Sequence, residues 1–102
     1  MSYLKYPRKR HTCVTDGHTY VFVIGGDHYK KVERYNVITR DVVVLDNDAP
    51  FEKGEGINMA VCFQNTGAKC GLIYVLTKGK LFVLPTNGAS TNEKWLHLEF
   101  NF

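Results

Sequence analysis

A short apolar run that ends in two glycines constrains the fold of this chain more than any other feature. Residues 20–26 read Tyr-Val-Phe-Val-Ile-Gly-Gly. The run is too short for a buried helix, and its β-branched and aromatic side chains favour a strand. A strand that is apolar on both faces must be covered on both faces. Gly25 and Gly26 tolerate positive φ, so the pair predicts a sharp turn or a bulge where the strand ends.

The rest of the chain also has strand character, and no segment carries a helical stripe. Asp16-Gly17 and Lys78-Gly79 predict hairpins, and a polar loop is expected from Pro85 to Thr91. The segment 31–37 is expected to have one solvated face. The predicted strands are 10–15, 20–24, 31–37, 42–45, 57–63, 72–76, 81–84 and 95–100. The pattern therefore predicts an all-β chain with eight strands in two groups of four.

The two groups of strands repeat each other. The apolar run at 72–76 has the character of the run at 20–24, and Val23 and Val75 lie 52 residues apart. A period of about 40–50 residues with four strands per unit is typical of propeller blades. We expect a basic N-terminal arm at 1–9, a first blade at 10–50 and a second at 51–102.

The first unit resembles the kelch repeat. In that family an aromatic and apolar strand ends in a Gly-Gly pair, and an acidic-x-Tyr-Asp-x-x-Thr-x-x-Trp segment follows. The matching positions are Arg10, His11, Gly25, Gly26, Glu33, Tyr35, Asn36 (in the Asp position) and Thr39. Val42 stands where the family has its tryptophan.

The second unit departs further from the kelch pattern. Residues 73–76 match the apolar strand, but Thr77 and Lys78 stand where the two glycines occur, and Trp95 takes the place of the family tryptophan after a longer loop. The resemblance implies two four-stranded antiparallel blades, which is a partial propeller, with Tyr35 and Trp95 as packing anchors. The alternative is a small β-sandwich.

Two blades do not close a propeller, which needs about 4–8 blades. Each blade packs both faces on its neighbours, so the two outer faces are expected to be apolar and in need of cover. Four outcomes remain open. The chain forms a six-bladed trimer, forms a four-bladed dimer, completes a ring begun by other subunits, or closes its two sheets on each other as a monomeric sandwich.

The residues that could carry chemistry show no catalytic or metal-binding pattern. The histidines His11, His18, His28 and His97 have no partner at metal-ligand spacing, and no nucleophile signature is present. We therefore expect no cofactor and no enzymatic activity.

The three cysteines are sparse and lack a C-x-x-C pair, which indicates a reducing compartment. Cys13 and Cys62 lie in predicted strands, where buried and inert thiols are common. A bridge between Cys62 and Cys70 across a hairpin is left open.

Basic residues gather at the N-terminus, at Lys5, Arg8, Lys9 and Arg10. The net charge is +3 and these four contribute +4, so the remainder of the chain carries about −1. Clustered cations attract an acidic protein surface or phosphates. No apolar h-region follows, so no signal peptide is expected, and no apolar run is long enough for a membrane span.

Kelch proteins bind partners through loops on a propeller face, often as scaffolds or as substrate receptors for ubiquitin ligases. The resemblance implies a non-enzymatic interaction or structural subunit that joins other protein subunits in a homo-oligomer or a hetero-complex. It also implies a place in the cytoplasm or nucleus, or within a viral particle. The alternative is a nucleic-acid-binding β protein that uses the basic arm.

Overall fold

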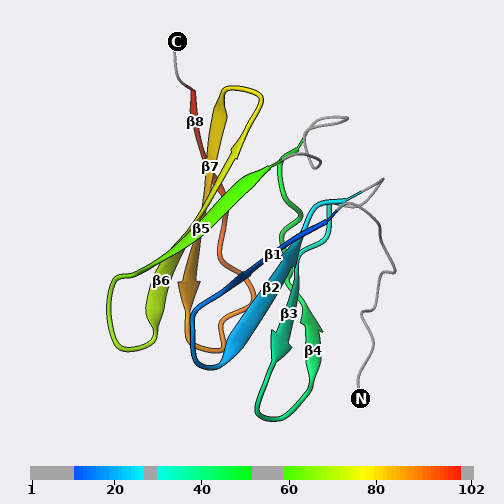
Figure 1. Ribbon diagram of the computed structural model, residues 1–102, viewed down its shortest axis with the longest axis vertical. Helices are drawn as coiled ribbons and strands as arrows, with labels where there is room; N and C mark the ends of the chain where they lie inside the picture. Colours follow the sequence, from blue (N-terminus) through cyan, green and yellow to red (C-terminus); the bar gives the residue numbers. More distant parts are fainter. Residues whose placement is uncertain (1–10, 27–29, 52–58, 100–102) are drawn as a thin grey trace.

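The computed structural model describes residues 11–26, 30–51 and 59–99, and every regular element in these ranges is a β-strand. The strands form two four-stranded antiparallel sheets, in the orders β1-β2-β3-β4 and β5-β6-β7-β8 (Figure 1). The strands are β1 (Thr12–Thr15), β2 (Tyr20–Ile24), β3 (Glu33–Asn36), β4 (Val42–Val44), β5 (Ala60–Asn65), β6 (Cys70–Thr77), β7 (Lys80–Asn87) and β8 (Leu96–Glu99). This confirms the all-β fold and its division into two groups of four strands.

The strand β7 is longer than the sequence predicted. It continues through Pro85 to Asn87, where a polar loop was expected, and Pro85 pairs with Leu72 of β6. On its other side β7 pairs with β8 only as far as Val83. The strand is therefore open on that side at Pro85, where a residue without an N–H is tolerated.

Glycines occupy left-handed backbone positions at three of the predicted turns. Gly25 and Gly26, directly after β2, have φ of 74° and 105°. The β6–β7 hairpin turns on Lys78 and Gly79, both with positive φ, as expected of a tight two-residue turn. Between β1 and β2 only Gly17 has positive φ, and five residues (16–20) separate Thr15 from its pairing partner Val21. The hairpin that the sequence predicted at Asp16-Gly17 is therefore confirmed.

The core lies between the two sheets. Alternation along the strands turns one face of each sheet toward the other, and buried side chains from both faces form one cluster. Phe51, from the segment after the first sheet, packs edge-on against Phe82 and Trp95, with ring centroids 5.4 and 5.9 Å away. The cluster is Phe22, Ile24, Val32, Leu45, Ala49, Phe51, Ile73, Val75, Phe82 and Leu84.

Polar contacts also join the sheets. The loop between β7 and β8 reaches the residues after β4, where the Asp46 N–H donates to the Thr91 carbonyl at 2.8 Å. The Asn47 side-chain amide donates to the carbonyls of Asn92 and Glu93 at 3.1 and 2.9 Å. The first strands of the sheets, β1 and β5, lie in contact. The arrangement is consistent both with two adjoining blades and with a small sandwich.

None of the three cysteines forms a disulfide, and all three are exposed. The expectation of buried thiols at Cys13 and Cys62 was wrong, because each points away from the core on its strand. A bridge to Cys70 is disfavoured by register, since Cys62 lies opposite Tyr74 whereas Cys70 lies opposite Asn87.

Candidate functional site

The second sheet is apolar on the side that faces away from the core. Inter-strand pairing places Leu76, Leu81 and Leu98 in one row across three strands, next to a row of Tyr74, Val83 and Leu96. We call this surface the outer face of the second sheet. It comprises Ala60, Cys62, Gln64, Cys70, Leu72, Tyr74, Leu76, Leu81, Val83, Pro85, Asn87, Leu96 and Leu98. None of these residues is charged.

Three leucines of this face are open to solvent. Leu76, Leu96 and Leu98 are 41%, 55% and 53% exposed, respectively. An antiparallel sheet with one solvated side normally alternates apolar residues inward with polar residues outward. The second sheet breaks that rule, since β6 and β7 carry apolar side chains on both faces. Exposed apolar patches of a few hundred Å² are often binding sites.

The corresponding side of the first sheet has no exposed large apolar side chain among its described strands. It carries Cys13 and Thr15 on β1, and its central row includes Val23, which is 5% exposed, and Glu33, which is fully buried. The remaining members, Val21, Tyr35, Val42 and Val44, are half-buried. Large exposed apolar side chains in the described part of the chain therefore concentrate on the second sheet and at Val37 and Ile38 of the β3–β4 turn.

A cavity of about 500 Å³ lies between the sheets, where the β1–β2 turn approaches the β5–β6 turn. Its aromatic lining comes from Tyr20, Phe22 and Phe63. Its polar lining includes Asp16, His18, Thr19, Asn65, Lys69, Cys70 and Thr86.

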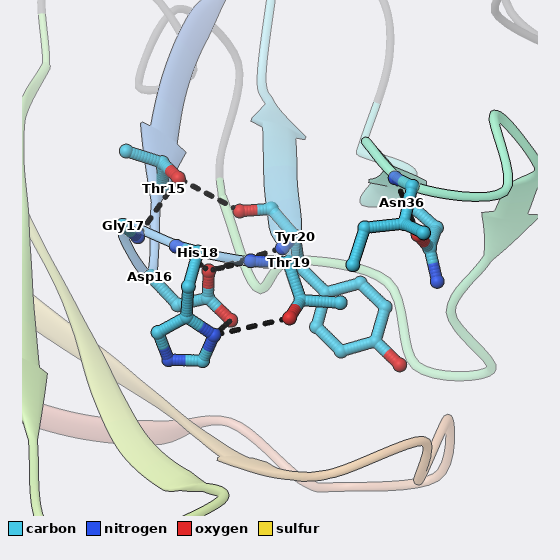
Figure 2. Close-up of polar contacts among 8 residues, drawn as sticks. Thr15, Asp16, Gly17, His18, Thr19, Tyr20 and Asn36 are labelled. Carbon is cyan, nitrogen blue, oxygen red and sulfur yellow. Dashed lines mark hydrogen bonds and ion pairs between the residues drawn. The ribbon is translucent and has the colours of Figure 1, made fainter.

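The Asp16 carboxylate organises the β1–β2 turn, as Figure 2 shows. Its Oδ1 accepts from the backbone N–H groups of His18, Thr19 and Tyr20 at 2.9–3.0 Å. Partial burial acts to raise the pKa of Asp16, but the three N–H donors and the nearby His18 offset it, so the pKa lies below its ordinary value. The turn is thus built around a carboxylate whose charge is satisfied locally.

Several polar side chains that line the cavity contact neighbouring polar residues. His18 Nδ1 lies 3.0 Å from Thr19 Oγ1 and 3.7 Å from Asp16 Oδ2. The Cys70 thiol donates to Asn87 Oδ1 at 3.5 Å. This acceptor is an amide oxygen, which is not a base that could deprotonate the thiol. In the described ranges, His, Cys, Asp and Glu side chains nowhere gather in threes as a metal site requires. The polar contacts beside the cavity are therefore of the kind that hold a turn together.

The structure describes only some of the residues singled out from the sequence. Lys5, Arg8, Lys9 and Arg10 fall outside the described residues, so the predicted basic arm stays a prediction. Gly25 and Gly26 end β2, and Tyr35 lies on the outer side of β3. Trp95 precedes β8 and packs on the core cluster, with its Nε1 buried and without an acceptor.

The outer face of the second sheet was not singled out residue by residue from the sequence. The available signal was the apolar character of both faces of β6 and β7. No helix in the described residues is long and apolar enough to cross a membrane. Comparison with protein-family models, curated proteins and solved structures found no match to this chain.

Proposed function

We propose that this chain is a non-enzymatic interaction or structural subunit that docks the outer face of its second sheet onto another protein surface. The observation that carries the proposal is a sheet face with no charged residue and with Leu76, Leu96 and Leu98 exposed. Burying such a face against a partner is favourable, because removal of apolar surface from water contributes about 25 cal/mol per Å² to the free energy of association.

The proposal also includes a kelch-like arrangement, in which the two sheets are adjoining blades of an incomplete propeller. The positive φ of both Gly25 and Gly26 supports it, as does the contact between β1 and β5, the first strands of the two sheets. In this arrangement the outer face takes the place where the next blade would pack. The three cysteines without a disulfide support a reducing, intracellular setting or a viral particle.

The test compares the assembly state of the chain in an extract of its natural source with that of a charged variant. Leu96→Asp combined with Leu98→Asp places two charges on the outer face, and Ile38→Asp is the matched control on an exposed apolar residue of the β3–β4 turn. The proposal predicts that the wild type and Ile38→Asp migrate in a native separation well above 11.6 kDa. The double variant is expected to lose that assembly. Wild-type chain at its own mass, or a double variant that keeps the assembly, contradicts the proposal.

A further inference from the structure

The cavity of about 500 Å³ has walls that belong to both sheets. One wall comes from the β1–β2 turn and β2, and the other comes from β5, the β5–β6 turn and the end of β7. Small-molecule sites in proteins have volumes of about 300–1,000 Å³ and combine apolar and aromatic walls with a few polar groups. The cavity has that size and that mixed lining, and the proposed docking of the outer face does not require it.

Three aromatic rings form the apolar part of the lining, and the fold positions them. Tyr20 and Phe22 come from β2, and their ring centroids lie 6.2 Å apart. The Arg34 guanidinium covers one face of the Tyr20 ring, 4.6 Å from its centroid. Phe63 comes from the opposite wall, and its ring lies so close to Gly71 that a Cβ there would have no room. Rings fixed in this way are suited to hold another flat ring by stacked or edge-on contacts.

The acidic side chain of the first wall is already engaged by its own turn. Asp16 Oδ1 accepts the backbone N–H groups of His18, Thr19 and Tyr20, and Oδ2 lies 3.7 Å from His18 Nδ1. Hydrogen bonds to a carboxylate are charge-assisted, so the turn compensates the negative charge locally. Asp16 therefore offers little further attraction to a cationic ligand.

The opposite wall carries the cation of the lining, Lys69. This residue is exposed in the β5–β6 turn, and its carbonyl accepts the Gly88 N–H at 2.7 Å, which ties the turn to the end of β7. Other polar side chains of that wall, such as Asn65 and Thr86, are neutral. Within the described ranges, no acidic side chain forms an ion pair with the Lys69 ammonium group. An ammonium group in such a position attracts an anionic group of a ligand.

From these observations we infer that the cavity binds a small, flat aromatic anion. The ring of the ligand lies against Tyr20, Phe22 and Phe63, and its acidic group lies toward Lys69. A carboxylate, a sulfonate and a phosphate share the chemistry that Lys69 recognises. The inference goes beyond the proposed function, because it assigns a ligand to a surface other than the outer face of the second sheet.

The experiment titrates the purified chain with two fluorescent probes. Anilinonaphthalene sulfonate is an aromatic anion, and phenylnaphthylamine has the same rings without the sulfonate. We expect the anion to bind several-fold more tightly than the neutral probe. Backbone amide NMR spectra locate the bound anion, which should shift the signals of Tyr20, Lys69 and Thr86 and leave those of Leu96 and Leu98 in place. The Leu96→Asp, Leu98→Asp double variant should bind the anion like the wild type.

Two variants test the residues of the cavity. Lys69→Gln is expected to lose about two- to five-fold in affinity for the anion, the range for an exposed ion pair, and to bind the neutral probe unchanged. Lys94→Gln, at an exposed lysine outside the lining, is the matched control and should bind both probes like the wild type. Ala89→Trp adds bulk at an exposed residue of the lining and should abolish the binding of both probes. Circular dichroism of each variant verifies that the sheets remain folded.

Amide shifts confined to the outer face overturn the inference, and so do equal affinities of the wild type for the two probes. An anion affinity that Lys69→Gln leaves unchanged, or a folded Ala89→Trp variant that still binds, has the same consequence. These outcomes do not affect the proposed function, which stands or falls with the assembly in the natural extract.

Discussion

The guanidinium carbon of Arg34 lies 4.6 Å from the centroid of the Tyr20 ring, on the inward side of the first sheet. Arg34 is 6% exposed, and its Nη1 donates to the Ser90 carbonyl in the loop between β7 and β8 at 3.0 Å. One side chain therefore contacts an aromatic ring of its own sheet and the backbone of the other half of the chain. This makes Arg34 a link between the two sheets.

We expect Arg34→Met to lower the free energy of unfolding by about 1.5–3 kcal/mol, the range for hydrogen bonds to charged groups. The variant keeps apolar bulk but loses the bond to Ser90 and the cation–π contact with Tyr20. Urea denaturation measures the change. Lys94→Met, at an exposed residue of the same loop, serves as the control and is expected to be close to neutral. Equal stability of the two variants would contradict the linking role of Arg34.

Removing the Asp16 carboxylate should loosen the β1–β2 turn. Asp16→Ala leaves three backbone N–H groups without their acceptor, and we expect a loss of about 0.5–2 kcal/mol, as for a helix N-cap. Asp16→Asn keeps an oxygen acceptor at the same position and should lose less. A thermal melt series of the three proteins measures this, and no difference between alanine and wild type would refute the organising role of the carboxylate.

The same carboxylate predicts a dependence of stability on pH. Because the folded-state pKa of Asp16 is lowered, its contribution is fully present above the unfolded-state value of about 3.9. The contribution is lost as the pH falls from there through the folded-state pKa. Unfolding measured between pH 7 and pH 2 should therefore show a smaller acid loss in Asp16→Asn than in the wild type. Parallel curves for the two proteins argue against this linkage.

Gly71 leaves room for the Phe63 ring on the neighbouring strand. A Cβ at Gly71 would lie 2.2 Å from Phe63 Cζ and 2.9 Å from the Gln64 carbonyl oxygen. We expect Gly71→Ala to cost about 1–3 kcal/mol through overpacking. Gly67→Ala is the matched control, since its Cβ would meet only the Cys70 Cβ at an ordinary 3.8 Å. The denaturant midpoints of the two variants measure the difference in stability. A Gly71→Ala variant as stable as Gly67→Ala would show that the Phe63 ring does not pack closely against Gly71.

Trp95 should contribute through its ring more than through its indole N–H. It is half-buried against Phe51, and we expect Trp95→Ala to cost about 2–4 kcal/mol. Trp95→Phe should cost much less, because the buried Nε1 has no acceptor and its removal leaves no bond unmade. Equilibrium unfolding compares the two variants, and equal losses would show that the N–H matters after all.

Strand identity was predictable from the sequence because the signal is local. Apolar runs such as 20–24 and 72–76, with turn residues between them, placed all eight strands. The burial of a strand's two faces depends on segments far away in the sequence, and there the sequence pattern failed. The segment 31–37 indicated a solvated face, yet Glu33 and Arg34, which point to opposite sides of β3, are both buried. The other half of the chain accounts for part of this, since Arg34 bonds to Ser90, 56 residues away.

The sequence predicted that an apolar sheet surface needs cover, but it did not predict which residues form that surface. Apolar residues on both faces of the strand at 72–76 indicated that both sides of its sheet need cover. That Leu76, Leu81 and Leu98 form one row depends on the register of three strands, and register is set by turn lengths and by packing. The cavity beside Asp16 has the same origin, because hairpins about fifty residues apart meet there.

The most direct test of the docking face uses Cys62, which is exposed on that face, with Cys13, which is exposed on β1 of the first sheet, as an internal reference. Alkylation of both thiols is followed by peptide mass spectrometry in the native assembly and in the Leu96→Asp, Leu98→Asp double variant. We predict that Cys62 reacts several-fold more slowly than Cys13 in the wild-type assembly, and that the double variant abolishes this difference. Equal alkylation rates of Cys62 and Cys13 in the wild-type assembly would contradict the docking of this face.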